Sequence, residues 1–395
     1  MNKKLIGAVF FIAGTSIGAA ALALPVVAST LGFFGTFFAF FISWLVMYYA
    51  GLMVVEVSLA CKEEHSFISM TEFTLGPSYK WPIAIAYSIL LYSLLAAYFT
   101  GGADLAKAFF SAVGFSNLPL IVDTMPFMLV TALVVYLGAK YIDYLNRLMV
   151  TGLILSFLLL LFLLIDNADF TFSMSKQKFE FSSFVAMMPV IITAFGYQVV
   201  IPSVRHYLAK SVELLPKAIF LGSAIPFILY FIWAIVIFMV LPATGTYSIS
   251  SLVQSSQPAT DLPLFLSALF NIKILTVATS LFAFFALSSS ILGIAFSLFD
   301  FLADKLIYGK NQLSKSSVLM ITLFPPALFS VFYPDGFILA LSFAGIFVAI
   351  LNGILPVIML YKLRVATAKK ITMRDYFAMF FVVVVSILLI LSYLY

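Results

Sequence analysis

Charged residues are scarce in this chain. Only 9% of its 395 residues are Asp, Glu, Lys or Arg, whereas 64% are hydrophobic. A water-soluble domain carries about 25% charged residues, so this chain cannot cover a water-facing surface. The scarcity excludes a soluble globular protein. It predicts an all-α integral membrane protein, because helices satisfy their own backbone hydrogen bonds in lipid.

Cysteine and histidine are also rare. The single cysteine, Cys61, excludes an intramolecular disulfide, and the only histidines are His65 and His206. The sequence contains no HExxH motif, cysteine cluster or Ser-His-Asp grouping, so we expect neither enzyme activity nor a cofactor. The net charge of +5 raises the question of nucleic-acid binding, but we expect no nucleic-acid partner, because the basic residues follow membrane topology.

Eleven apolar segments are long enough to cross a hydrocarbon core of about 30 Å, which takes about 20 helical residues. The predicted spans are residues 5–28, 33–60, 81–107, 122–140, 146–165, 184–203, 217–240, 272–303, 316–333, 336–360 and 375–395. The first also has features of a signal peptide, but its apolar run continues past a normal h-region, and we expect it to be retained.

The basic residues predict the orientation of these spans. With the N-terminus in the cytoplasm, 17 of the 21 Lys and Arg residues fall on the cytoplasmic side. The C-terminus then lies outside, and the basic residues can also contact anionic lipid headgroups. Of the longer connections, residues 61–80 lie inside, whereas 166–183 and 241–271 lie outside. The last is either a plain loop or holds a short helix over the outer entrance.

Two of the spans carry helix-breaking residues near their middle. Residues 13–25 read AGTSIGAAALALP, and residues 194–203 read AFGYQVVIPS. Gly and Pro weaken the helical hydrogen-bond ladder. The first interrupted span begins one set of five spans, and the second begins another. Because five is odd, the second set crosses the membrane in the opposite direction to the first. Corresponding interruptions in two inverted halves indicate the binding site of a transporter.

The interrupted backbone offers both donors and acceptors. We expect free N–H groups at Ile17, Gly18 and Ala19 to bind a carboxylate. The carbonyls of Ala13, Gly14 and Phe195 would face an ammonium group or a cation. A site with both suits an α-amino acid. The alternative for Gly14 and Gly18 is close helix packing.

Both interrupted segments resemble the bacterial hydroxy and aromatic amino acid permeases. In the first, the matching residues are GTSIGA at 14–19 with Leu24-Pro25. In the second they are FGYQ at 195–198 with IPS at 201–203. The run WLVMYY at 44–49 with Glu56, and SLFDFLAD at 297–304, resemble the tyrosine-specific members in particular.

The resemblance covers essentially the whole chain and implies a fold and an activity. The fold is the leucine-transporter type, with inverted repeats at residues 1–165 and 184–360 and an eleventh helix at 375–395. The implied activity is proton-coupled uptake of an aromatic amino acid, tyrosine first, across the bacterial inner membrane. Many relatives carry histidine where this chain has Gln198. Glutamine cannot titrate, so proton coupling here needs another residue.

The expected substrate site combines residues of spans 1, 3, 6 and 8. Tyr92, Phe99 and Gly102 are spaced to share one face of span 3 as a wall for a flat ring, although ordinary packing would also explain the aromatic residues. The full set is Ala13, Gly14, Thr15, Ser16, Ile17, Gly18, Ala19, Tyr92, Phe99, Gly102, Phe195, Gly196, Tyr197, Gln198 and Ser288.

A sodium site is the alternative to proton coupling. In the resembled fold a sodium ion lies between the span-1 interruption and hydroxyl residues of span 8. The positions here are Gly14, Ile17, Ala286, Ser289 and Ser290, and oxygen ligands suit a hard cation. The serines can instead bond to their own helix.

The few ionisable residues within or beside the spans offer further roles. Glu56 either carries a proton or gating role or forms an ion pair at the inner surface. The basic residues just past span 6 either belong to an inner gate with Asp300 or Asp304 or anchor the topology; they are Arg205, His206 and Lys210. A channel would need a ring of charge or a polar pore, which the sequence does not show. Serine or threonine uptake is the other substrate class of the resembled family. The oligomeric state stays open.

Overall fold

The computed structural model describes residues 3–61, 66–115, 118–165, 181–242, 244–254, 258–270, 273–306 and 313–394. Within these ranges the chain is helical and contains no strand. The helices are α1 (Lys3–Ser16), α2 (Ala20–Ala60), α3 (Phe67–Leu75), α4 (Lys80–Ala112), α5 (Leu120–Leu137), α6 (Ala139–Ile165), α7 (Phe181–Thr193), α8 (Ile201–Leu208), α9 (Leu215–Val240), α10 (Ile249–Val253), α11 (Pro258–Phe270), α12 (Lys273–Leu306), α13 (Lys315–Phe332), α14 (Phe337–Val348), α15 (Leu355–Ala366) and α16 (Met373–Leu394).

Ten helical segments of the described chain are long and apolar enough to cross a membrane. Each overlaps one of the predicted spans from the second to the eleventh, which confirms that those ten exist. They are Leu31–Ala60, Pro77–Ala112, Leu120–Leu137, Ala139–Ile165, Phe181–Leu208, Ser211–Val240, Ile274–Ala303, Lys315–Phe332, Phe337–Ala366 and Met373–Tyr393.

The first predicted span has a different form. It consists of α1 and the first turns of α2, and neither piece alone has the length of a span. No loop separates it from the second span. Instead, α2 bends sharply at Gly32, where φ is 64° and ψ is 176°. A positive φ of this kind favours glycine because a side chain would clash with the backbone.

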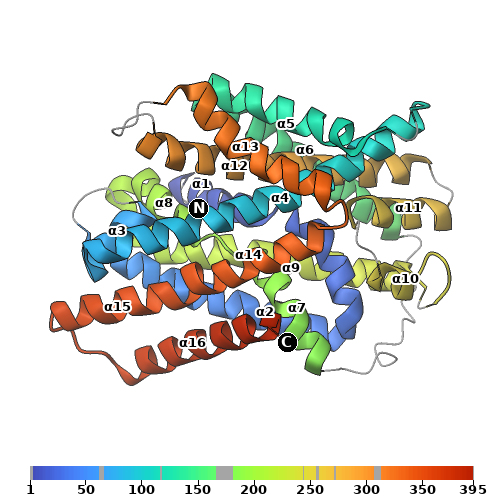
Figure 1. Ribbon diagram of the computed structural model, residues 1–395. Coiled ribbons are helices and arrows are strands. Elements are labelled where there is room, and N and C mark those ends of the chain that lie inside the picture. Colours follow the sequence, from blue (N-terminus) through green and yellow to red (C-terminus); the bar gives the residue numbers. More distant parts are fainter. Residues whose placement is uncertain are drawn as a thin grey trace.

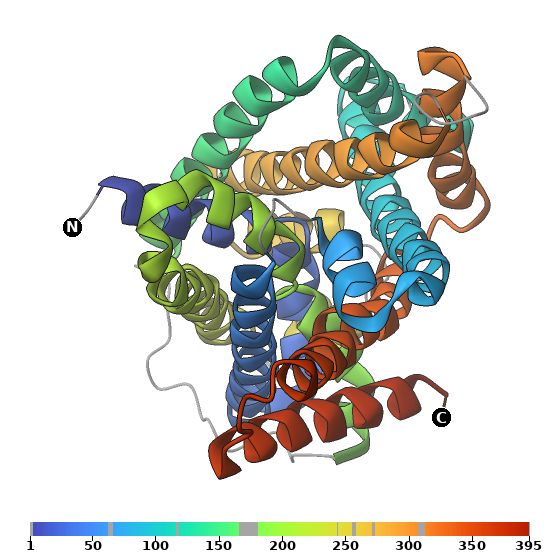
Figure 2. The same ribbon diagram turned by 90° about the vertical axis from the view of Figure 1, so that its left-hand side faces the viewer.

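The helices pack as two groups. One group contains α1, α2, α7, α8 and α9, in which α2 packs against α7, α8 and α9, and α1 packs against α8 and α9. The other contains α4, α5, α6, α12 and α13, in which α12 packs against α6 and α4 (Figures 1 and 2). Helix α14 packs against α4 and α7 and thus joins the two groups. The interrupted segments therefore belong to one packed unit.

Connections that were predicted to lie on opposite sides of the membrane lie at opposite ends of the molecule. Helix α3 and the turn between α15 and α16 lie at the left-hand end of Figure 1, whereas α10 and α11 lie at the right-hand end. The prediction of a short helix within residues 241–271 is confirmed by α10 and α11, and α11 packs against α12 and α4. Most of the predicted outer segment 166–183 lies outside the described residues.

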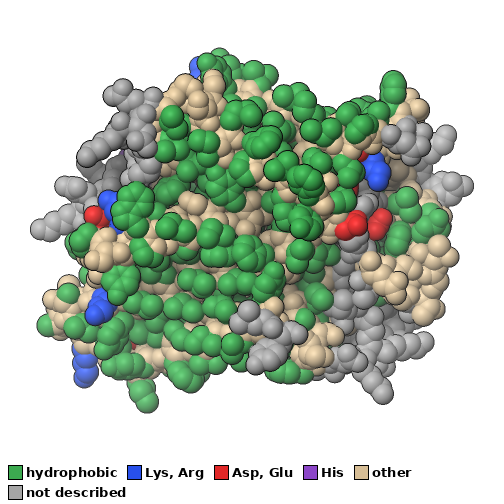
Figure 3. All heavy atoms as spheres, in the orientation of Figure 1, with side chains coloured by type: hydrophobic (Ala, Val, Ile, Leu, Met, Phe, Trp, Pro, Cys, Tyr) green, Lys and Arg blue, Asp and Glu red, His purple; other side chains and the backbone are tan. Residues whose placement is uncertain are grey.

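The surface supports a membrane location. On the face shown in Figure 3, hydrophobic side chains cover the middle of the molecule, and charged side chains gather towards its two ends. Exposed large apolar side chains include Phe162, Leu133 and Phe380, which are 60–72% exposed. An apolar belt of this kind faces lipid.

Candidate functional site

The first predicted interruption is present. Helix α1 ends at Ser16, residues 17–19 are not helical, and α2 begins at Ala20. The Ile17 N–H still donates to the Ala13 carbonyl at 2.8 Å, and the ladder resumes when the Ala21 N–H donates to the Gly18 carbonyl at 2.9 Å. The break therefore spans one turn, and its backbone groups need partners elsewhere.

Tyr230 of α9 supplies one of these partners. Its hydroxyl donates to the Ser16 carbonyl at 2.6 Å, and it also interacts with the backbone of Gly18. The Tyr230 ring meets Phe195 of the second interruption edge-on, with the ring centroids 5.8 Å apart. Both side chains are at most 1% exposed. One tyrosine thus joins the two interruptions, which lie more than 170 residues apart in the chain.

Ser290 of α12 supplies the other partner. The Ala19 N–H donates to the Ser290 hydroxyl at 2.9 Å. A Cβ added at Gly18 would lie 2.2 Å from the same oxygen and 4.0 Å from the Ala286 carbonyl. Glycine is therefore required at position 18 by this close approach of α12, and not only by helix breaking.

These contacts correct one expectation. We expected free N–H groups at Ile17, Gly18 and Ala19, but the amides of Ile17 and Ala19 donate to Ala13 and Ser290. In the described conformation, protein groups therefore satisfy these two amides.

The residues just before the break have different surroundings. Ala13 and Ser16 are buried, and the Ser16 hydroxyl donates to the Ile12 carbonyl at 3.4 Å. Thr15 is exposed, and its hydroxyl donates to the Phe11 carbonyl in its own helix. A Cβ at Gly14 would meet nothing within 4 Å. Among the described atoms, open space therefore adjoins Gly14, whereas Gly18 is in close contact with α12.

The second predicted interruption is present as well. Helix α7 ends at Thr193, residues 194–197 are not helical, and a 3₁₀ turn at Gln198–Val200 leads into α8. Ala194, Phe195 and Tyr197 are buried. A Cβ at Gly196 would lie 3.3 Å from the side-chain amide of Asn352, so this asparagine lies against the break.

Two of the predicted residues point towards α2. The Tyr197 hydroxyl and the Gln198 amide nitrogen both donate to the Met47 carbonyl, at 3.2 and 2.9 Å. The Gln198 side-chain oxygen is buried without a hydrogen-bond partner among the described residues. The pair therefore fixes the second break to α2 and leaves one buried acceptor oxygen available.

Sequence reasoning missed Tyr230 and Asn352. Asn352 lies in a π-helical turn, Ala349–Ile354, and its side-chain oxygen is buried without a partner among the described residues. Single π turns often mark functional sites. An asparagine within the apolar run VAILNGILP was a signal that could have found it. Tyr230 gave no such signal, because it is one of 19 tyrosines.

The predicted aromatic wall of span 3 does not form as a single face. Phe99 is fully buried, but the Tyr92 hydroxyl donates to the Ile321 carbonyl of α13 at 2.9 Å. A Cβ at Gly102 would lie 2.9 Å from the Phe127 ring of α5. Tyr92 therefore faces α13 and Gly102 faces α5, because the packing of α4 against these two helices decides which side each residue occupies.

The three serines of α12 also separate. Ser290 reaches the first break, whereas the Ser289 hydroxyl donates to the Ala286 carbonyl at 3.1 Å, as the bonding within its own helix predicted. Ser288 lines a small apolar pocket with Phe127 and Met149, between α5, α6 and α12. Of the proposed sodium ligands, Ser290 and the Ala286 carbonyl adjoin the break at Gly18. These oxygens have the chemistry that a sodium ion requires.

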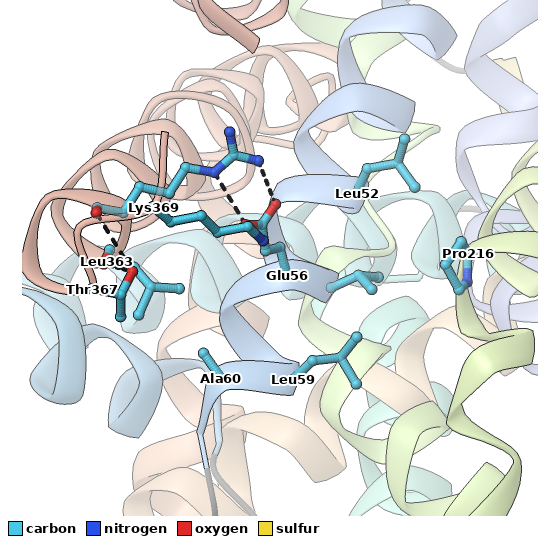
Figure 4. Close-up of a pocket in the computed structure, with 10 residues that line it drawn as sticks. Leu52, Glu56, Leu59, Ala60, Pro216, Leu363, Thr367 and Lys369 are labelled. Atoms are coloured by element: carbon cyan, nitrogen blue, oxygen red, sulfur yellow. Dashed lines mark hydrogen bonds and ion pairs between the residues drawn. The ribbon is translucent and has the colours of Figure 1, made fainter. Parts of the chain in front are cut away.

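A charge cluster lies at the end of the molecule that carries α3. Arg364 of α15 donates to Glu56 of α2 at 3.1 and 2.6 Å and also pairs with Asp375 of α16. Lys369 binds Glu56 at 2.9 Å. Both residues line a groove with a volume of about 800 Å³, and Figure 4 shows them among its lining residues. The ion-pair interpretation of Glu56 is thus confirmed.

Arg205 caps the end of α2. Its guanidinium donates to the carbonyls of Ser58 and Cys61, the latter at 2.9 Å. A cation at a helix C-terminus is stabilised by the helix dipole. These carbonyl contacts tie α8 to α2.

The fold and the two joined interruptions define a multi-pass helical membrane protein of the transporter class. Residues 1–394 match the tryptophan/tyrosine permease family, and the chain belongs to this family. The chain is 31% identical to a tyrosine-specific transport system 2 of Haemophilus influenzae, over 92% of this chain and 89% of the relative.

Other relatives carry different substrate names. A tryptophan-specific transport protein of Haemophilus influenzae is 27% identical, over 91% of this chain and 87% of the relative. A glutamine transporter 2 of Aliivibrio fischeri is 26% identical, over 92% of this chain and 90% of the relative. All three are transport proteins and not enzymes. Membership in the permease family and the apolar helices establish an amino acid transport protein of the inner membrane.

Proposed function

We propose that this protein imports an aromatic amino acid, tyrosine first, by proton-coupled symport. The observation that carries the proposal is the contact of Tyr230 with both interruptions. A substrate that replaces this contact would donate from its ammonium group to the Ser16 carbonyl, and its carboxylate would accept from the Ala19 amide in place of the Ser290 hydroxyl. The aromatic ring would lie beside Phe195.

The packing supports alternating access by a leucine-transporter-type fold. The first repeat is residues 1–165, the second is 184–360, and residues 375–395 add an eleventh span. Spans 1, 2, 6 and 7 correspond to the contacting helices α1, α2, α7, α8 and α9. This unit would rock against the scaffold formed by α4, α5, α6, α12 and α13. The N-terminus would be cytoplasmic and the C-terminus periplasmic.

Sodium coupling is the second candidate. The observation in its favour is that Ser290 and the Ala286 carbonyl adjoin Gly18 at the first break. Together with Gly14, Ile17 and Ser289, they would hold a hard cation through oxygen ligands. Glutamine, serine and threonine are the other substrates to be compared.

Uptake into proteoliposomes tests the proposal. An inward proton gradient should accumulate labelled tyrosine several-fold above the level reached without a gradient, and a protonophore should abolish the accumulation. The accumulation of labelled tryptophan, serine and glutamine is measured under the same gradients and compared with that of tyrosine. Accumulation of tyrosine under a sodium gradient alone would favour sodium coupling over proton coupling. If the tyrosine flux is the same with a proton gradient, with a sodium gradient and with neither, symport is contradicted.

Tyr230→Phe should lower the initial rate of uptake about tenfold. The variant leaves the buried Ser16 carbonyl without its donor, and an unsatisfied buried group costs about 1–3 kcal/mol. Tyr92→Phe is the matched control, because it also removes one hydroxyl bonded to a carbonyl, but at α13. We expect its rate to stay within about twofold of the wild type. Equal rates in the two variants would show that the Tyr230 contact does not matter for transport.

A further inference from the structure

Asp104 is a buried acidic residue in a membrane span. It lies in α4, eight residues before Ala112, the last residue of the helix, and thus about 12 Å from that end. The residue is 6% exposed, and one of its carboxylate oxygens has no hydrogen-bond partner among the described residues. An ionised carboxylate in this position is costly, and a buried acid within a membrane span indicates a functional site.

Charges from four elements act on this carboxyl. Lys107 lies one turn further along α4, Asp123 is in α5, Asp261 is in α11, and Asp335 is in the turn between α13 and α14. Asp123 is 2% exposed and also has a buried oxygen without a partner in the described chain. Figure 3 shows acidic side chains beside a basic one at the end of the molecule where α11 lies. Negative charge therefore exceeds positive charge around Asp104.

The ligand that suits this cluster is a proton. No group of three or more His, Cys, Asp or Glu side chains in the described part of the chain is arranged to hold a metal ion. A proton removes the charge of one carboxylate and needs no further ligands. The neutral carboxyl group can also donate a hydrogen bond to a neighbouring acid.

The cluster is mechanically connected to the first interruption. One turn before Asp104, a Cβ at Gly101 would lie 3.0 Å from Phe337 and 3.1 Å from Leu287. Leu287 lies in α12, one turn before Ser290, which binds the Ala19 amide. Helix α11, which carries Asp261, packs against both α4 and α12. A change of charge at Asp104 therefore acts on the helices that hold the break closed.

We propose that Asp104 is the residue that binds the coupling proton at the outer end of the transporter. The inference rests on the proposed proton-coupled uptake, and it fills the role that Gln198 cannot perform. When Asp104 is ionised, its repulsion from Asp261 separates α11 from α4. A proton bound from the outside removes this repulsion and shifts the population towards the conformation in which α11 packs against α4, without locking the protein in it.

Asp104→Asn tests the inference in proteoliposomes. The variant should exchange tyrosine across the membrane at a rate within about threefold of the wild type, but an inward proton gradient should no longer drive accumulation. Asp104→Glu, which keeps the carboxyl group, should retain gradient-driven accumulation. If the wild type itself ignores the proton gradient, the proposed symport fails. If the wild type accumulates tyrosine under the proton gradient and Asp104→Asn does so as well, the role of Asp104 is refuted.

Lys107 and Asp335 are exposed residues that interact with Asp104. Substituting them gives a second test that leaves Asp104 itself unchanged. Lys107→Gln should move the pH of half-maximal uptake upwards, because it removes a positive charge that opposes protonation. Asp335→Asn should move it downwards. Each shift should be about 0.3–1 pH unit.

Asp143→Asn is the matched control, because Asp143 is exposed and paired with Arg147 on α6. It should leave the pH of half-maximal uptake unchanged. Opposite shifts in the two neighbours support the inference even if Asp104→Asn does not fold. Equal pH profiles in Lys107→Gln, Asp335→Asn and the wild type would overturn it.

Discussion

Gly18→Leu is expected to abolish uptake while the protein stays folded in detergent. A Cβ at this position would lie 2.2 Å from the Ser290 hydroxyl, and a leucine side chain is larger still. Ser290 would have to move away from the Ala19 amide, and the leucine would fill the place where a substrate carboxylate meets the break. We expect uptake to fall at least about 100-fold, since both the backbone contact and the space are lost.

The matched control is Gly14→Ala in the same segment. A Cβ at Gly14 would meet no atom within 4 Å, so uptake should stay within about twofold of the wild type. Size-exclusion chromatography of both variants separates loss of function from loss of fold. Normal tyrosine affinity in Gly18→Leu would remove the first interruption from the substrate site.

Arg364→Ala is expected to have the largest effect on stability. The guanidinium joins Glu56 of α2 to Asp375 of α16, and its side chain is only 8% exposed. Breaking a buried pair costs about 3–5 kcal/mol. The carboxylates left behind are 28% and 25% exposed, so solvent reduces the loss to about 2 kcal/mol. The melting temperature in detergent should fall by about 2–3 °C.

Lys369→Met is the control for this cluster. Lys369 also binds Glu56, but its side chain is 62% exposed. We expect a change of less than about 1 kcal/mol, because exposed ion pairs contribute little. If both variants melt at the wild-type temperature, the cluster is a surface feature without a structural role.

The membrane class and most of the spans could be predicted because composition and apolar length act locally. The ten predicted spans from the second to the eleventh overlap the observed helices. Both breaks were predictable too, because Gly14, Gly18, Gly196 and Pro202 weaken a helix wherever it packs. The connection between the first two spans was not predictable, since a single kink at Gly32 replaces the expected loop.

The side-chain environment of the candidate site was less predictable. Helical spacing placed Tyr92, Phe99 and Gly102 on one face, but neighbouring helices α5 and α13 enclose Tyr92 and Gly102. Spacing says which residues share a stripe, and only packing says which helix that stripe meets. The partners of the first break, Tyr230 and Ser290, are more than 200 residues away from it.

By itself, the sequence determined that this chain is a helical membrane protein with two interrupted spans, because lipid demands apolar length and helices tolerate few breakers. The tertiary structure alone decided how those breaks are filled. Tyr230 and Ser290 satisfy the first, Met47 and Asn352 adjoin the second, and the buried Asp104 interacts with charged residues of other elements. Such contacts depend on the packing of helices distant in the chain, which no local pattern of residues encodes.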